Sequence, residues 1–448
     1  MSKPEWAIVI LIAIMASQSI LQAQGDVTWN TQLVDHAGSG GSIALDSYGN
    51  PHIAYALWSF ENDSTSTSLN YAVWTGTNWA IQTVDPSGSS GLLALDSMDR
   101  PHIIYTVGYD LKYAVLNGKN WDIQTIDSSG MWIRYSMALD SNGNPHVVYS
   151  TFNYYKNYVN NSETEDIKYA VLDGANWAIQ TIDSVNVTVG NISPSIALDS
   201  SNNPHMIYLE TVQFQYPNKN SWNNLSFWET YNVKYASLTG SSWLVQTVVT
   251  NSTAIGNLVL DSKGQPSFCY IHENFSFIPE SSSFQTSGSM NYAYWNGYAW
   301  LSRAIDSKPS SSGQTYLNLD SNGNPQVYFY VENYQKPTDS GLMYTQWTGS
   351  SWNIQNIGSI PSNSDYYQST ANIADIAFDA HGKLSLTYDG EVGTIRSAPI
   401  YGDLTYASLE TPLTSAPDHL LIIISVAITA VTILIVVLII YKKKRSKG

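Results

Sequence analysis

Short apolar runs, each followed by a cluster of turn-forming residues, recur along most of this 448-residue chain. The clearest run, Ile43–Leu45, is followed by Asp-Ser-Tyr-Gly-Asn-Pro and then by His52–Tyr55. β-Branched and aromatic residues favour strands, whereas Gly, Asn, Asp and Pro favour turns. The pattern therefore predicts two short strands joined by a turn, which we call the Asp box. Its seven aspartates are Asp46, Asp96, Asp140, Asp199, Asp261, Asp320 and Asp379.

Two further strand-like runs follow each Asp box. The first contains a tyrosine, as in Ile167–Leu172, and the second starts at a tryptophan, as in Trp177–Asp183. A β-rich repeat of about 50 residues with four strands is typical of one blade of a β-propeller. The marker tyrosines are Tyr71, Tyr113, Tyr169, Tyr235, Tyr292, Tyr344 and Tyr406. The marker tryptophans that follow them are Trp79, Trp121, Trp177, Trp243, Trp300 and Trp352.

The last repeat lacks its tryptophan strand, and a matching strand stands at the start of the chain. Trp29–Asp35 has the same pattern as Trp79–Asp85. A strand that completes the last blade from the N-terminus closes the ring and removes two open sheet edges, whereas an open solenoid needs capping repeats. We therefore predict an all-β, seven-bladed β-propeller over residues 25–409, with the N-terminal strand beside the strand that carries Tyr406.

Both ends of the chain carry apolar segments outside the repeats. Residues 1–24 are typical of a secretory signal peptide, cleaved after Ser19 or Ala23, with a non-cleaved anchor as the alternative. Residues 420–441 are uncharged, and a helix of this length, at about 1.5 Å per residue, spans a hydrocarbon core of roughly 30 Å. The tail 442–448 is basic, so it stays in the cytoplasm. We expect a single-pass cell-membrane protein with an extracellular propeller and a short spacer, 410–419.

The composition agrees with this placement. The formal net charge is −16, which does not suit a nucleic-acid partner because such binding needs a basic surface. The one cysteine, Cys269, lies in a strand-like run and has no partner for an internal disulfide, so we expect a small core residue.

Seven Asn-x-Ser/Thr sequons are candidate N-glycosylation sites. In an exported protein such sequons lie on surface loops, and we place all of them in connections between strands. Whether each one is modified stays open, because matches arise by chance in a chain rich in Asn and Ser. The sites are Asn62, Asn160, Asn186, Asn191, Asn224, Asn251 and Asn274.

The long connections of each blade, from the second strand to the third and from the fourth to the next blade, share one face. Variable loops on a rigid scaffold are a common place for function, and these loops are rich in aromatic residues. Tyr and Trp make adaptable contact surfaces for a glycan or a protein; packing of the loops onto the blades is the alternative. The candidate binding-face aromatics are Trp58, Tyr154, Tyr155, Trp222, Phe227 and Trp228.

No catalytic motif stands out in the chain. Calcium at each Asp box is the alternative to a structural turn, although a box offers one carboxylate. Asp365, Asp375 and Glu391 break the repeat, but nothing else marks them. Hydrogen-bonded structural roles are expected for the box histidines, which are spread over separate blades: His52, His102, His146 and His205. The carboxylates that end the tryptophan strands are interpreted as turn formers: Asp35, Asp85, Asp127, Asp183 and Asp306. We assign no catalytic residue, no metal and no cofactor.

The segments Asp140–Tyr149 and Ile167–Trp177 resemble repeats of exported bacterial and archaeal propellers, and distantly NHL repeats and the Asp-box repeats of sialidases. The resemblance covers about residues 26–409 and implies the fold, because propellers host unrelated activities. Sialidases hold a substrate carboxylate with three arginines. Here Arg100 is expected in a turn and Arg303 in an outer strand, which leaves Arg134 and Arg396 and does not support such a cluster.

The sequence thus predicts a membrane-anchored surface propeller that binds surface glycans or envelope proteins. A membrane-tethered carbohydrate-active enzyme is one alternative, although no catalytic group supports it. A structural component of a glycosylated surface layer is the other.

Overall fold

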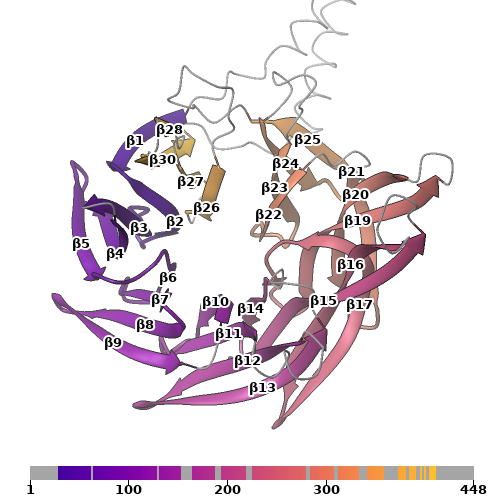
Figure 1. Cartoon of the computed structure of the whole chain (residues 1–448), viewed down its shortest axis with the longest axis horizontal. Helices are drawn as coiled ribbons and strands as arrows, with labels where there is room; N and C mark the ends of the chain where they lie inside the picture. Colours follow the sequence, from indigo (N-terminus) through magenta and orange to yellow (C-terminus); the bar gives the residue numbers. More distant parts are fainter. Residues whose placement is uncertain are drawn as a thin grey trace, which may run out of the picture.

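The computed structural model describes residues 29–61, 64–128, 131–152, 164–186, 193–217, 225–278, 283–306, 311–331, 341–357, 372–379, 383–389, 394–395, 398–399 and 403–409. Within these ranges the sheets stand around a common centre, so this part of the chain is an all-β propeller (Figure 1). No helix in these ranges is long and apolar enough to cross a membrane. The predicted segments 1–24, 410–419, 420–441 and 442–448 lie outside the described residues.

Five of the sheets are four-stranded blades, and Figure 1 shows their first strands beside the central opening. The first blade contains β2 (Gly38–Leu45), β3 (Pro51–Glu61), β4 (Ser64–Trp74) and β5 (Trp79–Asp85). The next contains β6 (Leu92–Leu95), β7 (Pro101–Val107), β8 (Asp110–Asn117) and β9 (Asn120–Asp127). The third contains β10 (Met131–Leu139), β11 (Pro145–Phe152), β12 (Thr164–Asp173) and β13 (Asn176–Asn186).

The fourth and fifth of these sheets come from the second half of the chain. One contains β22 (Ser311–Leu319), β23 (Pro325–Val331), β24 (Gly341–Trp347) and β25 (Trp352–Asn356). The other contains β26 (Asn372–Phe378), β27 (Leu384–Asp389), β30 (Leu404–Leu409) and β1 (Trp29–Asp35). Two short strands form a separate pair, β28 (Thr394–Ile395) and β29 (Ala398–Pro399).

The two repeats that lie between β13 and β22 in the chain share one eight-stranded sheet. Its first four strands are β14 (Ser195–Leu198), β15 (Pro204–Pro217), β16 (Leu225–Thr239) and β17 (Ser242–Ile255). The others are β18 (Val259–Leu260), β19 (Pro266–Ile278), β20 (Ser283–Trp295) and β21 (Trp300–Asp306). The two groups are joined because the end of β17 pairs with β19, from Ser252 opposite His272 to Ile255 opposite Tyr270.

The N-terminal strand completes the last sheet, as predicted. β1 pairs antiparallel with β30, with Trp29 opposite Leu409 and Gln32 opposite Tyr406. The ring also closes on the other side of this sheet, where Trp29 Nε1 donates to the carbonyl of Ile357 at 3.3 Å. One cluster of buried residues there joins Tyr344 of β24 to Leu386 of β27.

A belt of hydrogen bonds ties the inner strands of successive sheets together. It uses the residue directly before each apolar triplet, a position held by Ser42, Leu92, Ser136, Ser195, Asn257, Tyr316 and Asp375. The Ser42 hydroxyl accepts from Leu93 N–H at 3.2 Å, and the Asp375 carboxylate accepts from Ile43 N–H at 3.0 Å. Residues at the same position hydrogen-bond to the backbone of the following repeat at four further interfaces: Ser136, Ser195, Asn257 and Tyr316.

A second set of contacts joins the outer strand of one sheet to the second strand of the next. The hydroxyl of Tyr55 on β3 donates to Asp35 on β1 at 2.6 Å, and Tyr105 on β7 donates to Asp85 on β5 at 2.9 Å. The pairs Tyr149–Asp127 and Tyr208–Asp183 repeat the contact. The interpretation of the strand-ending carboxylates as turn formers was therefore incomplete, since these four also hold one sheet to the next.

The Asp boxes are turns held by their own carboxylates, as expected. Asp46 Oδ1 accepts from the N–H groups of Tyr48 at 2.9 Å and Asn50 at 2.7 Å, and Gly49 supplies the positive φ of 81°. Burial alone would raise the pKa of Asp46, but these hydrogen bonds hold it below its ordinary value. The box histidine is structural too, because His102 lies 2.6 Å from the Tyr113 hydroxyl and 3.4 Å from Asp96.

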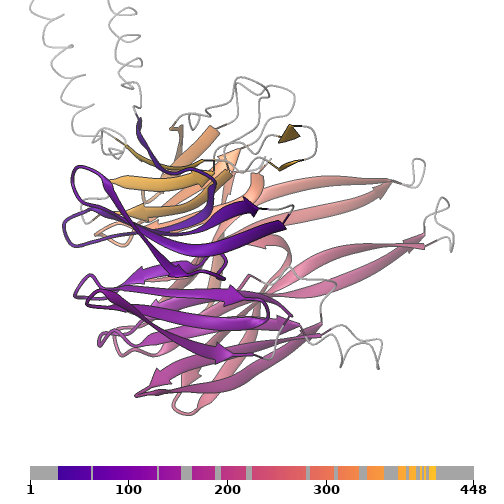
Figure 2. The same cartoon turned by 60° about the vertical axis from the view of Figure 1, so that its left-hand side comes forward.

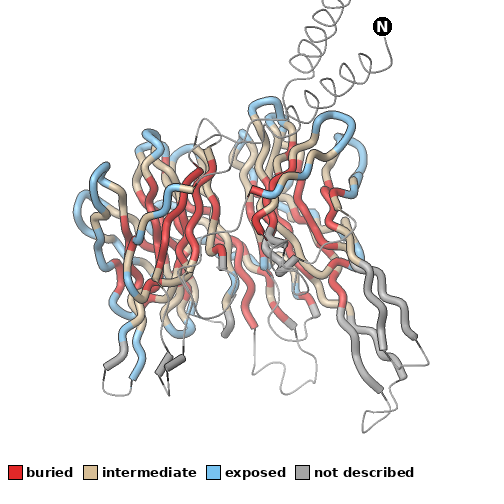
Figure 3. Tube along the Cα trace, turned by 90° about the horizontal axis from the view of Figure 1, so that it is seen from above, coloured by how far each residue is buried: buried red, intermediate tan, exposed pale blue. Residues whose placement is uncertain are grey.

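The core lies between neighbouring sheets, and Figure 3 shows the buried residues along the middle of the strands. Aromatic pairs recur there: six marker tryptophans each pack edge-on against the marker tyrosine of the repeat before. The ring centroids of Tyr71 and Trp121, for example, are 5.3 Å apart, and those of Tyr406 and Trp79 are 5.6 Å apart. Such pairs add about 0.5–1.5 kcal/mol beyond burial. Cys269 is fully buried in this core, as predicted.

Several connections that we expected to be loops are extensions of the strands. β15 with β16 and β19 with β20 form long hairpin arms that reach away from the ring (Figure 2). The expected loop position is therefore wrong for three sequons: Asn186 ends β13, Asn251 lies in β17 and Asn274 lies in β19. Asn251 is exposed and has a φ of 56°, so it stands at an irregularity of its strand. The other four sequons lie outside the described residues.

Candidate functional site

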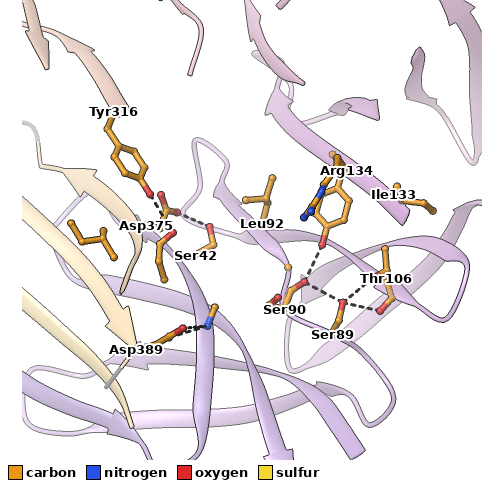
Figure 4. Close-up of a pocket in the computed structure, with 15 residues that line it drawn as sticks. Ser42, Ser89, Ser90, Leu92, Thr106, Ile133, Arg134, Tyr316, Asp375 and Asp389 are labelled. Carbon is orange, nitrogen blue, oxygen red and sulfur yellow. Dashed lines mark hydrogen bonds between the residues drawn. The ribbon is translucent and has the colours of Figure 1, made fainter. Parts of the chain in front are cut away.

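A pocket of about 660 Å³ lies at the centre of the ring. Strands β2, β6, β7, β10, β22, β26 and β27 contribute to its walls, and Figure 4 shows their side chains converging from opposite sides. Thr106 and Asp389 lie at or near the ends of β7 and β27, the second strands of their blades. The long connections follow the second strands, so the pocket lies at the end of the ring that carries these connections. Its polar lining consists of Ser42, Ser89, Ser90, Thr106, Arg134, Tyr135, Tyr316, Asp375 and Asp389.

Two carboxylates occupy one side of this central pocket. Asp375 accepts three hydrogen bonds, from the Ser42 hydroxyl at 2.8 Å and from the N–H groups of Ile43 at 3.0 Å and Ile376 at 2.8 Å. Burial raises the pKa of Asp375 to about 6, although these donors act in the opposite direction. Asp389 accepts from Gly40 N–H at 3.0 Å, and burial raises its pKa as well. Both carboxylates therefore hold the wall of the pocket in place.

Arg134 lies across the pocket from these carboxylates (Figure 4). It is exposed, and no hydrogen bond or ion pair to its guanidinium is made by any residue that the structure describes. Its charge acts on Glu165, a buried residue of β12: burial raises the pKa of Glu165 to about 7, and Arg134 acts in the opposite direction. Arg134 therefore offers its N–H donors to the pocket.

Hydroxyl groups and aromatic rings line the remaining wall. The Ser89 hydroxyl lies 2.8 Å from that of Thr106, and the Tyr135 hydroxyl donates to the carbonyl of Ser90 at 2.9 Å. Tyr316 reaches from β22 to the carbonyl of Ala374 at 3.3 Å. A site that combines hydroxyls, tyrosine rings and one guanidinium suits a ligand with many hydroxyl groups. No activated nucleophile is present among these residues.

Trp58 is not among the residues that line this pocket, and it is the one predicted binding-face aromatic whose side chain the structure describes. The indole N–H of Trp58 on β3 donates to the Ser39 hydroxyl at 2.8 Å, which fits the packing alternative. Phe227 and Trp228 lie in β16, opposite Gln215 and Phe214, and thus on a hairpin arm. Tyr154, Tyr155 and Trp222 lie outside the described residues.

Sequence reasoning missed most of the pocket. Asp375 was noted only as a break in the repeat, whereas Asp389, Tyr316 and Arg134 were given no role in a site. A signal was present at the belt position, where Asp375 is charged and Tyr316 is aromatic while the other five repeats have serine, leucine or asparagine. Arg134 and Asp389 stand at positions that vary from repeat to repeat, so no comparable signal marks them.

No protein-family model and no curated protein sequence matches this chain. Several solved structures share its arrangement of sheets. The propeller domain of the Trilobed protease from Pyrococcus furiosus is 9% identical, with coverage of 85% of this chain and 100% of that one and a TM-score of 0.46. The polysaccharide lyase Uly1 is 9% identical, with coverage of 82% and 89% and a TM-score of 0.47. AofleA from Arthrobotrys oligospora is 12% identical, with coverage of 74% and 89% and a TM-score of 0.39. Similarity at this level carries no conclusion about activity.

Proposed function

We propose that this chain is a membrane-anchored surface receptor whose seven-bladed propeller binds a glycan in its central pocket. Seven blades are supported by the eight-stranded sheet, which contains two four-stranded groups joined only because β17 runs on into pairing with β19. They are also supported by the core, because the described residues contain seven buried clusters, each between two successive four-stranded groups.

The observation that carries glycan binding is the lining of the central pocket. Its hydroxyls and carboxylates can exchange hydrogen bonds with sugar hydroxyls, Tyr135 and Tyr316 present rings, and Arg134 has N–H donors to which no described residue is bonded. The volume of about 660 Å³ falls in the range of small-ligand sites, about 300–1,000 Å³, and holds one or two sugar units. An envelope protein that inserts a polar loop is the other ligand class that such a pocket accepts.

The placement at the cell surface rests on the sequence. The apolar stretch 420–441, followed by the basic tail 442–448, would anchor the chain, and the signal-like residues 1–24 would export it. The spacer 410–419 would then hold the propeller close to the membrane. Glycosylation would occur at exposed sequons such as Asn251.

The test uses the full chain, purified in mild detergent, on a panel of envelope polysaccharides and oligosaccharides. Binding and the mass of the ligand after incubation are measured together. Saturable binding with unchanged ligand mass is the expected result. Absence of saturable binding to every glycan would refute glycan binding and direct the search to envelope proteins or to assembly of a surface layer.

A membrane-tethered carbohydrate-active enzyme is the second candidate, favoured by one observation. Asp375 and Asp389 break the repeat, line the same pocket and have raised pKa values, and paired carboxylates carry out glycoside hydrolysis. The hydrogen bonds that both residues accept argue for a wall-forming role instead. Shortened products in the same experiment would make the enzyme the primary function, provided that Asp389→Asn abolished them.

A further inference from the structure

A second pocket, of about 290 Å³, lies between the four-stranded group β18–β21 and the sheet β22–β25. It is lined by the Asp box of one repeat, through Asp261 and Ser267, and by residues of the next box, including Asn324. These turns lie at the end of the ring opposite the long connections, so this outer pocket is separate from the central one. No prediction from the sequence pointed to this position.

Arg303 of β21 is the central residue of the outer pocket. Its guanidinium carbon lies 4.7 Å from the centre of the Tyr294 ring and 4.5 Å from the centre of the Trp347 ring. Two aromatic contacts of this kind hold the flat guanidinium in place and leave its N–H edge directed elsewhere. Across the described ranges, no residue accepts a hydrogen bond from Arg303 or forms an ion pair with it.

Arg303 departs from a rule that the other six repeats obey. The marker tyrosine is paired with a residue three positions after the tryptophan, and this pair is Tyr292 opposite Arg303 in β20 and β21. In every other repeat the partner is glutamine: Gln32, Gln82, Gln124, Gln180, Gln246 and Gln355.

In two repeats the glutamine has a structural role that arginine cannot fill. Gln124 and Gln180 accept hydrogen bonds, each at 3.0 Å, from the indole N–H of the tryptophan in the next repeat. Arginine has no acceptor and cannot make this bond. The bond is not made in every repeat, because the indole N–H groups of Trp79, Trp121 and Trp300 are buried without a partner among the described residues, as is that of Trp352 beside Arg303. The six glutamines show that the repeat does not require arginine at this position.

Two further departures from the repeat meet in the same pocket. Ser267 stands where the first four boxes have histidine, and Tyr294 stands where their repeats have Val or Ser. In those boxes the second carboxylate oxygen contacts the histidine, as Asp96 Oδ2 does at 3.4 Å from His102. In this box Asp261 Oδ1 accepts from Lys263 and Gln265 N–H, and Oδ2 has no donor among the described residues. The smaller serine therefore opens the pocket and leaves an acceptor in it.

From these contacts we infer that the outer pocket binds a carboxylate-bearing sugar, such as a hexuronic acid unit of an acidic glycan. The sugar carboxylate pairs with the N–H edge of Arg303, a ring hydroxyl donates to Asp261 Oδ2, and the apolar face of the sugar lies against the aromatic side chains. The inference rests on the proposed glycan binding, extends it to a second site and narrows the class of glycan.

The experiment titrates the full chain in detergent with a short oligogalacturonide, and follows tryptophan fluorescence and the heat of binding. The same oligosaccharide with methyl-esterified carboxylates, which keeps the sugar and removes the charge, is the ligand control. The test variant is Arg303→Gln, which installs the residue of the other six repeats and should fold at least as stably as the wild type. The matched control is Arg100→Gln, which removes a guanidinium that pairs with Asp96 in another Asp box, outside both pockets. A third variant, Arg134→Gln, removes the guanidinium of the central pocket and reports on that site.

The expected result is saturable binding of the acid form, weakened at least about tenfold by methyl esterification or by Arg303→Gln and retained in Arg100→Gln. Equal binding of both forms, or an Arg303→Gln variant that binds like the wild type, would overturn the inference. Loss of binding in Arg134→Gln alone would also overturn it, yet would support glycan binding in the central pocket. The two proposals therefore fail separately.

Discussion

The latch between Tyr55 and Asp35 closes the ring, and Tyr55→Phe tests it by removing one hydroxyl group. Tyr55 is fully buried on β3, and its hydroxyl lies 2.6 Å from the carboxylate of Asp35 on the N-terminal strand. Phenylalanine keeps the packing of the ring and removes only the hydrogen bond. Any loss of stability therefore measures the hold of β1 on the first sheet.

The expected loss of unfolding free energy is about 2 kcal/mol. A hydrogen bond to a charged acceptor contributes about 1.5–3 kcal/mol, and Asp35 is partly exposed, so water can replace part of the contact. Tyr270→Phe is the matched control, because Tyr270 holds the same position of its repeat but bonds the neutral Ser302 hydroxyl at 2.8 Å. Its expected cost is about 1 kcal/mol, typical of a neutral hydrogen bond.

The assay combines urea denaturation of the full chain with hydrogen exchange of the backbone amides of β1 and β30. Tyr55→Phe should lower the midpoint more than Tyr270→Phe does, and should speed exchange first in β1, because a terminal strand can detach without opening the other sheets. A midpoint equal to that of the wild type, or faster exchange that spares β1, would refute the latch as a ring-closing contact.

Three further predictions follow from the contacts of the belt and the boxes. Burial lowers the pKa of His146 below its ordinary 6.5, so the stability it contributes is complete above about pH 6.5 and is lost as the pH falls toward the folded-state pKa. His146→Gln introduces the residue that a later repeat has at this position, Gln326, which donates to the Tyr344 hydroxyl at 3.1 Å. The variant should show a smaller fall in melting temperature between pH 7 and pH 5 than the wild type does. An equal fall in both proteins would contradict this. Asn202 has a φ of 63°, so Asn202→Ala should cost about 1 kcal/mol in a denaturation midpoint while Asn202→Gly costs less, and the reverse order would be inconsistent with the turn. Asp375→Ala leaves three donors without an acceptor and should destabilise the chain by roughly 2–4 kcal/mol in the same denaturation assay; a variant of wild-type stability would show that the belt is not needed at this interface.

The sequence predicted those parts of the fold that repeat. The Tyr and Trp markers specified four strands per repeat, and the match of Trp29–Asp35 to the later tryptophan strands predicted the pairing of β1 with β30, which is confirmed. These features are visible because local strand and turn preferences act over a few residues, and seven copies reinforce each other.

Contacts between repeats were not predictable in the same way. Asp35 and Asp85 carried the pattern of turn residues, and only the packing of neighbouring sheets shows that Tyr55 and Tyr105 reach them. The hairpin arms were missed because their sequences are polar and aromatic, and a strand can extend on pairing with its partner whatever the side chains suggest. The pockets were missed for a related reason: they arise where single residues depart from the repeat, as Asp375 and Arg303 do.

The most direct test of the account is an experimental structure of the full chain with a glycan selected from the panel. Density for a sugar unit inside the central pocket, within hydrogen-bond distance of Arg134 and Asp389, is the result that the account predicts. A glycan bound on the hairpin arm β15–β16 with the central pocket occupied by water alone would contradict it.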